Sequence, residues 1–403
     1  MLKRVGQTEM EKNHVTPEGA MIRIKDASYP APFHSGLEFN SPVHGNWNIV
    51  HTGMQVPESI QIYVCADNCM RGVVLTAAEM NALDRYSAIQ IREENVLDGG
   101  MEELMIEGVT DIIEKLKYRP RAILLFISCQ HFFLAYDQKM VFSVLRERFP
   151  DIKFVDCYMI PTLRKSGLTP DQKMRIQMYR MWEPRPLDRK KVNFIGSNLP
   201  LSPSCELIRM VEDAGYEYRD LYRCRTFEDY MAMAESALNL ACEPMAIPAA
   251  EDLKKRLGQD YLYLTFSFDF EELEENYRKL AGKLGIEKPD FAGLKAKAEQ
   301  ALVHARKVIG DTPVAVDYTF TFRILSFTRM LLEHGFRVTE IYADGFLPED
   351  EENFRWIQKN YPEIIISATN RPKMRFLYEH GEGKILAVGQ KSAYFTGTDH
   401  FVN

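Results

Sequence analysis

The sequence lacks any run of about 20 uninterrupted apolar residues, the length that a helix needs to cross a bilayer. It also lacks the apolar core of an export signal, because residues 1–26 begin with basic side chains but no hydrophobic stretch follows them. We therefore expect a cytoplasmic protein with no membrane partner. The net charge of −7 argues against nucleic acid as a partner, since phosphate binding favours a basic surface.

Two nucleotide-binding motifs are absent as well. The chain contains no G-x-x-x-x-G-K-[ST] sequence, and no G-x-G-x-x-G follows a predicted strand. If the function requires ATP hydrolysis or a dinucleotide, we expect another protein to supply it.

Cysteine is present, but in an odd number and without an export signal, which argues against a disulfide framework. Metal binding, catalysis and simple burial remain as explanations for the thiols. The seven cysteines are Cys65, Cys69, Cys129, Cys157, Cys205, Cys224 and Cys242.

Short apolar runs alternate with longer amphipathic ones along nearly the whole chain, which is typical of parallel sheets covered by helices. This pattern predicts an α/β fold. The runs that read as strands are 61–64, 122–128, 152–158, 192–196, 337–343, 363–367 and 384–389, with one more after residue 310. The stretches that read as helices include 99–117, 204–215, which ends on Gly215, and 322–335.

The chain therefore divides into three predicted α/β domains. The first, residues 1–189, carries the candidate cluster cysteines; the second covers 190–309 and the third 310–403. Residues 178–191 are rich in proline and charge and are predicted to link the first domain to the second.

Three thiols follow the predicted strands of the first domain. Cys65 closes one strand, Cys69 opens the next helix, and Cys129 closes a second strand. Ligands of parallel sheets bind beyond the carboxyl ends of the strands, so these thiols are expected to meet at one edge. Helix N-termini also favour thiolates, which are the ligands of iron–sulfur clusters. The C-x3-C pair is equally compatible with two buried thiols or a redox pair.

The segment 41–54 has neither helical nor strand periodicity and contains two histidines, His44 and His51. Each could be a metal ligand, a proton donor or a core residue with its hydrogen bonds satisfied. His131, in "SCQHFF", could support a ligand or simply start a helix.

The order "SPVHGNWNIVH…VCADNCMRGVVLTAAEM…ISCQHFFLAYD…DCYMIPTLRKSG", followed by two more βα units, resembles the nitrogenase component 1-type oxidoreductase family. The resemblance runs from about residue 38 to the end and is most specific between 42 and 166. It implies three Rossmann-like domains around a central cleft, a paralogous or identical partner subunit, and electrons from a separate P-loop, ATP-hydrolysing iron protein. The absence of a P-loop from this sequence agrees with ATP hydrolysis by a separate protein.

By motif, Cys69 and Cys129 resemble the second and third interface-cluster cysteines of nitrogenase subunits. The first falls within "SPVHGNW", which has no cysteine, so Cys65, His44 or the partner subunit would have to compensate. The resemblance therefore implies a [4Fe–4S] cluster in place of an eight-iron one. It leaves a second metal cofactor unidentified, because Cys205, Cys224 and Cys242 match no family motif, and it implies that the third domain lacks the family's last helices.

Three hypotheses follow. The first is a nitrogenase-like reductase subunit whose cluster, held by Cys65, Cys69 and Cys129 and lined by His44 and His51, relays electrons to a reducible substrate. The second is a scaffold or carrier for cluster or cofactor assembly. The third is a corrinoid-binding or small-molecule-binding protein whose cysteines are structural.

Overall fold

The computed structural model describes residues 19–33, 49–160, 167–287, 289–369, 371, 374 and 384–403. The described residues form two compact units. The two-sheet unit comprises those within 45–265 together with 283–286. The one-sheet unit comprises the described N-terminal segment and those within 266–282 and 287–403.

Four parallel strands form the first sheet, in the order β3-β2-β4-β5. They are β2 (Ser59–Cys65), β3 (Tyr86–Gln90), β4 (Ala122–Ser128) and β5 (Lys153–Met159). Every residue of β2 and β4 is buried, because helices cover both faces of these central strands. The predicted strands of this region are confirmed to within two residues at each end.

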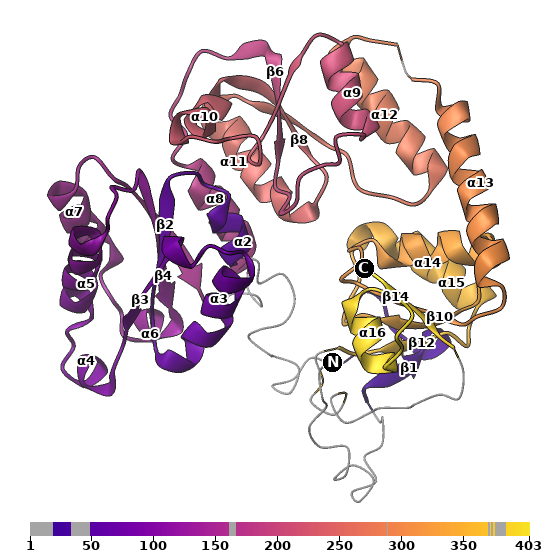
Figure 1. Cartoon of the computed structure of the whole chain (residues 1–403), viewed down its shortest axis with the longest axis horizontal. Helices are drawn as coiled ribbons and strands as arrows, with labels where there is room; N and C mark the ends of the chain where they lie inside the picture. The colour runs from indigo at the N-terminus through magenta and orange to yellow at the C-terminus, as the bar shows by residue number, and fades with distance from the viewer. Residues whose placement is uncertain are drawn as a thin grey trace, which may run out of the picture. The chain divides into compact units, whose positions relative to one another are not determined.

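Helices lie on both sides of the first sheet (Figure 1): α4, α5 and α7 on one side, and α2, α3 and α8 on the other. Their bounds are α2 (Ile49–Met54), α3 (Asp67–Glu79), α4 (Glu93–Leu97), α5 (Met101–Lys115), α6 (Cys129–Phe133), α7 (Gln138–Arg148) and α8 (Pro170–Tyr179). In α5, Met101, Met105, Val109 and Ile113 recur at helical spacing and are all buried, so a single apolar stripe faces the sheet.

The second sheet repeats this topology with four parallel strands in the order β7-β6-β8-β9. Its elements are β6 (Asp188–Ile195), α9 (Glu206–Asp213), β7 (Glu217–Asp220), α10 (Phe227–Ala232), β8 (Ser236–Ala241), α11 (Ile247–Leu257) and β9 (Asp260–Tyr263). One apolar cluster joins the two sheets, since it includes Tyr63 and Phe126 of the first sheet, Trp182 after α8, and Leu253 of α11. This shared core makes the two sheets one unit.

The third sheet has the order β1-β12-β11-β10-β13-β14. Its strands are β10 (Val314–Asp317), β11 (Val338–Tyr342), β12 (Ile365–Ser367), β13 (Leu386–Val388) and β14 (Phe401–Val402), all parallel, with β1 (Met21–Arg23) antiparallel to β12 at the edge. The helices of this part of the chain are α13 (Phe291–Ile309), α14 (Ile324–Glu333), α15 (Glu351–Asn360) and α16 (Gln390–Thr396), and α12 (Phe270–Leu284), whose last two residues belong to the two-sheet unit. Pairing with β12 brings residues 21–23 to a strand more than 300 positions later in the chain.

The α/β class with parallel sheets is confirmed, and β1 is the antiparallel addition that the sequence pattern did not predict. Three sheets are present, but β1 lies within the predicted first domain and pairs in the third sheet. The first two sheets share a core, and the predicted boundary at 189/190 falls inside β6. The division into domains 1–189, 190–309 and 310–403 stays a prediction. Among the described residues, no helix is both long and apolar enough to cross a membrane.

Candidate functional site

The three candidate cysteines lie along the carboxyl edge of the first sheet. Cys65 is the last residue of β2, and its carbonyl oxygen accepts a hydrogen bond from the Ile91 N–H at 3.0 Å. Cys69 lies in the first turn of α3, where its N–H donates to the Ala66 carbonyl at 2.9 Å. Cys129 is the first residue of α6, directly after β4. Cys65 and Cys129, which are 64 positions apart in the sequence, therefore lie at the carboxyl ends of two neighbouring strands.

This edge is the topological switch point of the first sheet. The chain leaves β2 for β3 on one side, and leaves β4 for β5 on the other. At such a point the loops diverge and leave a crevice, in which open α/β sheets bind their ligands. Cys65, the last residue of β2, and Cys129, directly after β4, therefore lie next to the position at which such sheets bind ligands.

The thiols do not share the same surroundings. Cys65 is fully buried within the apolar cluster that also contains Val73 and Ala77 of α3. Cys129 is half-buried and packs against the cluster on the opposite face of the sheet, whereas Cys69 is exposed. Cys69 and Cys129 are thus the accessible pair, and Cys65 lies behind them in the core.

The three sulfur atoms interact electrostatically. Burial, with smaller contributions from the neighbouring Cys69, Asp67 and Cys129, raises the pKa of Cys65 to about 12. Burial also raises the pKa of Cys69, with a second contribution from Cys129. The raised pKa values favour the neutral thiol at Cys65 and Cys69, and the positive charge of a bound metal ion or cluster would favour their thiolates.

The described residues do not contain a complete set of metal ligands. No group of three or more His, Cys, Asp or Glu side chains among them is arranged to hold a metal ion. His44, predicted as an additional ligand, lies outside the described residues. The chemistry of the thiol pair fits an iron–sulfur group, but further ligands have to come from elsewhere.

His131 lies next to Cys129 and caps α6. Its Nδ1 accepts a hydrogen bond from the Ser128 N–H at 3.2 Å, so the proton of the neutral ring is on Nε2. That Nε2 is buried and has no hydrogen-bond partner within the described part of the chain. Burial lowers the pKa of His131 to about 4, so the ring stays neutral at physiological pH.

An apolar patch follows Cys129 on the surface. The side chains of Phe132 and Phe133 are 65% and 73% exposed, and Leu134 is exposed as well. Soluble proteins rarely expose adjacent aromatic residues unless another surface covers them. The patch therefore marks the cysteine edge as a contact surface.

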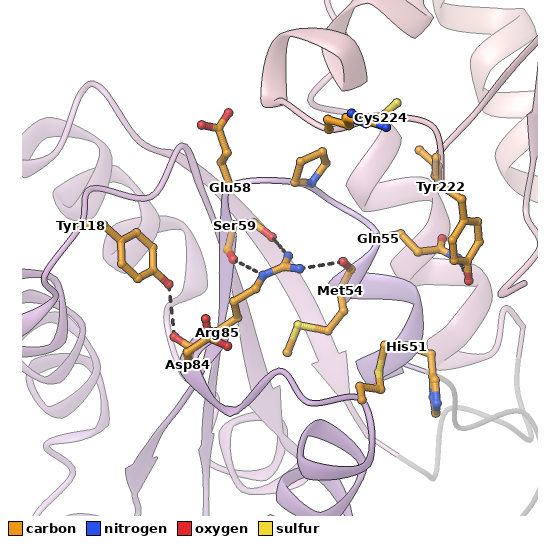
Figure 2. A pocket seen from close by; sticks show the side chains of 14 residues that line it. His51, Met54, Gln55, Glu58, Ser59, Asp84, Arg85, Tyr118, Tyr222 and Cys224 are labelled. Carbon is orange, nitrogen blue, oxygen red and sulfur yellow. Dashed lines mark hydrogen bonds between the residues drawn. The ribbon is translucent and has the colours of Figure 1, made fainter. Parts of the chain in front are cut away.

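His51 lines a different cavity, of about 510 Å³, at the amino ends of the first-sheet strands (Figure 2). Met54 and Gln55 of the same segment, Tyr118 before β4, and Tyr222 after β7 also line this cavity, and none of the three candidate cysteines does. Burial lowers the pKa of His51. The structure thus separates His51 from Cys65, Cys69 and Cys129, and its predicted catalytic role stays a prediction.

Arg85 is the best-anchored cation of this cavity (Figure 2). Its guanidinium donates to the carbonyl oxygens of Ser59 (2.9 Å), Met54 (3.0 Å) and Val56 (2.6 Å). Burial lowers the pKa of Arg85. Because its donors are committed to the backbone, Arg85 holds together the turn between α2 and β2.

A buried polar network near the second sheet was not anticipated from the sequence. Arg175 and Asp171 of α8 are each 1% exposed and form an ion pair at 3.1 Å. Arg175 also donates to Asn198, in the loop after β6, at 2.9 Å, and Thr52 of α2 donates to the same oxygen at 2.9 Å. The only signal in the sequence was an Asp and an Arg four residues apart, which more often forms an exposed helical pair.

The remaining cysteines are free thiols outside the candidate edge. Cys157 and Cys242 are buried, and burial raises the pKa of both thiols. Cys224 donates to the Asp220 carbonyl at 3.5 Å, and Cys205 precedes α9.

The comparisons with known proteins agree with this architecture. A solved structure described as "Nitrogenase Cp1 at pH 6.5" is similar with a TM-score of 0.66 and 13% identity, over 88% of this chain and 83% of that one. A second, "Nitrogenase Cp1 at pH 5", has a TM-score of 0.58 and 14% identity, over 97% and 88%. No curated protein sequence matches significantly. The family model described as nitrogenase component 1 type oxidoreductase matches residues 65–396, and the chain belongs to that family.

Proposed function

We propose that this chain is a subunit of a nitrogenase-like oxidoreductase in which Cys65, Cys69 and Cys129 hold an iron–sulfur cluster of the [4Fe–4S] type. One observation supports the proposal: Cys65 at the end of β2, Cys69 in the first turn of α3 and Cys129 directly after β4 all lie along the carboxyl edge of the first sheet, at its switch point. Proteins of this family bind metal–sulfur clusters, and thiolates are the usual ligands of such clusters.

The three cysteines have unequal parts in this proposal. Cys69 and Cys129 are accessible and supply the first two thiolates. Cys65 is the third ligand and has to turn its sulfur from the core toward the crevice. A bound cluster would supply one-electron transfer, and the chain's part is to hold it at the edge and to shield one side of it.

The partners follow from the same surface. A second subunit, either a paralogue or another copy of this chain, covers Phe132 and Phe133 and contributes the missing ligands. A separate P-loop iron protein delivers the electrons, because this sequence has no P-loop of its own. The final acceptor is a reducible substrate.

The test is the iron and acid-labile sulfide content of anaerobically purified protein, with an electron paramagnetic resonance spectrum after dithionite reduction. About four irons per cluster and a reducible signal are expected. Cys69→Ala and Cys129→Ala should each remove most of the iron, whereas Cys205→Ala, a thiol outside the edge, should retain it. Iron content unchanged in both edge variants would disprove the assignment of the site.

The exposure of Cys69 also suits a scaffold that passes a cluster to another protein, because an accessible ligand permits transfer. The two functions differ in their dependence on an electron donor. ATP-dependent reduction of the cluster by an iron protein supports the oxidoreductase. Loss of the cluster to an apo-acceptor, without such reduction, supports the scaffold.

A further inference from the structure

The cavity that His51 and Arg85 line is separate from the cysteine edge (Figure 2). Its volume of about 510 Å³ lies within the range of about 300–1,000 Å³ that is usual for small-molecule sites. Ser59, the first residue of β2, lines the cavity, and Cys65 is the last residue of the same strand. At about 3.3 Å per residue, the two ends of this strand lie about 20 Å apart. A ligand in the cavity would therefore not touch the cysteine edge.

The inner wall of the cavity is apolar and rich in sulfur. Met54 and Leu221 belong to the apolar core that the first two sheets share, and Met80 and Cys224 pack against that core. Thioether sulfur is polarizable and makes favourable contacts with aromatic rings. The wall therefore favours an aromatic ligand.

Two tyrosine rings extend this lining. Tyr118 and Tyr222 are 42% and 45% exposed, and both line the cavity. Their hydroxyl groups are already bonded, since Tyr118 donates to the Asp84 carbonyl at 3.2 Å and Tyr222 donates to the Asn198 carbonyl. The rings are thus available to a ligand, and they too favour an aromatic one.

The charges of the lining side chains cancel. Arg85 and Arg225 are positive, whereas Glu58 and Asp84 are negative. His51 is neutral at physiological pH, because burial lowers its pKa. The lining therefore offers no net charge to offset the hydration that an ionic ligand would lose, and an uncharged ligand is favoured.

One polar atom of the lining is buried without a partner. The Gln55 Nε2 donates to the Ser197 carbonyl at 2.8 Å and to the Tyr222 hydroxyl oxygen at 3.1 Å. Because a carbonyl can only accept, these bonds fix the orientation of the amide. The Gln55 Oε1 is buried and has no hydrogen-bond partner within the described residues. A buried acceptor of this kind is unfavourable, and a donor on a ligand would satisfy it.

We propose that this cavity binds a small, uncharged aromatic molecule that carries one O–H or N–H donor. The ring packs against the thioethers of Met54 and Met80 and the ring of Tyr222, and the donor bonds the Gln55 Oε1. The proposal does not depend on the cysteine site, so it can be tested whether or not the protein holds a cluster.

The experiment is a titration of the full chain with 2-naphthol, followed by NMR of protein with isotope-labelled methionine methyl groups. The signals of Met54 and Met80 should shift with a Kd below about 1 mM, as expected for an aromatic ligand of this size. Met101 and Met105 should not shift, because they pack in the apolar cluster on the opposite face of the first sheet. Unshifted Met54 and Met80 signals at millimolar 2-naphthol overturn the proposal, and so does a shift confined to other methionines.

Two analogues test the class of ligand. 2-Methoxynaphthalene has the same rings but no donor, so it should bind about tenfold more weakly than 2-naphthol. 2-Naphthoate is negatively charged and should also bind at least about tenfold more weakly. Equal affinity for 2-naphthol and 2-methoxynaphthalene overturns the donor assignment. Binding of 2-naphthoate as tight as that of 2-naphthol overturns the assignment of an uncharged ligand.

A pair of variants tests the acceptor. Gln55→Leu should abolish the preference for 2-naphthol and leave the Kd of 2-methoxynaphthalene within about twofold, because only the hydrogen bond is lost. Gln177→Leu, at a glutamine of α8 outside the lining of this cavity, should keep the preference. Unchanged Met101 and Met105 signals show that each variant is folded. A preference for 2-naphthol that persists in folded Gln55→Leu overturns the assignment of Gln55 as the acceptor.

Discussion

In each of the three sheets the chain leaves the first parallel strand (β2, β6 or β10) on one side and later returns to its other side, but the three switch points are used differently. In the first sheet, β2 ends in the buried Cys65, and the half-buried Cys129 directly follows β4. The exposed Cys69 lies in the helix after β2. In the second sheet, Gly196 directly follows β6 and packs against Ala246. In the third, β10 ends in Asp317, a fully buried carboxylate.

The difference shows which switch points support the fold. Asp317 accepts hydrogen bonds from the Thr319 N–H at 2.7 Å and the Ser392 N–H at 2.6 Å, so it ties the end of β10 to the start of α16. Gly196 allows the loop after β6 to approach the segment that precedes α11. At the cysteine edge, backbone groups and the His131 ring make such ties among the described residues, and the thiols themselves make none. Switch points of parallel sheets in one chain can therefore hold structural residues in two sheets and leave the third available for a ligand.

The largest effect on stability is expected at Gly196. Its φ of +83° is unfavourable for other residues, and an added Cβ would lie 2.0 Å from the Ala246 Cβ. Gly196→Ala should therefore destabilise the second sheet by about 3 kcal/mol or more. Hydrogen exchange of the β6 and β8 amides measures this loss locally.

The control is Gly215→Ala, since Gly215 has a similar φ of +73° but nothing within 4 Å of an added Cβ. Its cost should be about 1 kcal/mol, from backbone strain alone. Equal losses in the two variants would show that close packing at Gly196 contributes nothing.

A smaller effect is expected at Asp317. Asp317→Asn keeps the size of the side chain but replaces one carboxylate oxygen with an NH2 group, so one of the two backbone N–H donors loses its acceptor. The third sheet should lose about 2 kcal/mol, measured by hydrogen exchange of the β10 and β13 amides. Asp311→Asn is the matched control, because that side chain is 91% exposed and should change stability by no more than about 0.5 kcal/mol. An Asp317 variant as stable as its control would remove the structural role assigned to this switch point.

Much of this contrast could be predicted from local sequence, but part of it could not. The apolar runs of β2 and β4 and the apolar stripe of α5 are local patterns. The two runs predicted that the strands end at Cys65 and next to Cys129. Short strands of mixed character, such as β7 and β9, carry too few apolar residues to stand out. The pairing of β1 with β12 depends on residues far apart in the chain, which no local pattern reports.

The candidate site shows the same limit. The motifs placed Cys65, Cys69 and Cys129 at strand and helix ends, where the structure has them. They could not show that Cys65 belongs to the core or that His51 lines the cavity near Arg85, because burial depends on how the helices pack over the sheet. The Asp171–Arg175 pair was missed for the same reason, since its spacing fits a surface pair equally well.

The smallest effect on stability is expected at the cysteine edge itself. There, comparing stability with iron content distinguishes a residue that binds the cluster from one that supports the fold. Cys69 is exposed in the first turn of α3, so Cys69→Ala should change the unfolding free energy of the iron-free protein by no more than about 0.5 kcal/mol, while removing most of the iron. Cys157→Ala should have the opposite effect, because Cys157 is fully buried within β5, away from the strand end. Its unfolding free energy should fall by about 1 kcal/mol, while the iron content stays unchanged. Urea unfolding and iron analysis of the two variants measure both quantities. If Cys69→Ala unfolded the first sheet as readily as Cys157→Ala, its loss of iron would only report a damaged fold, and the first switch point would be structural like the other two.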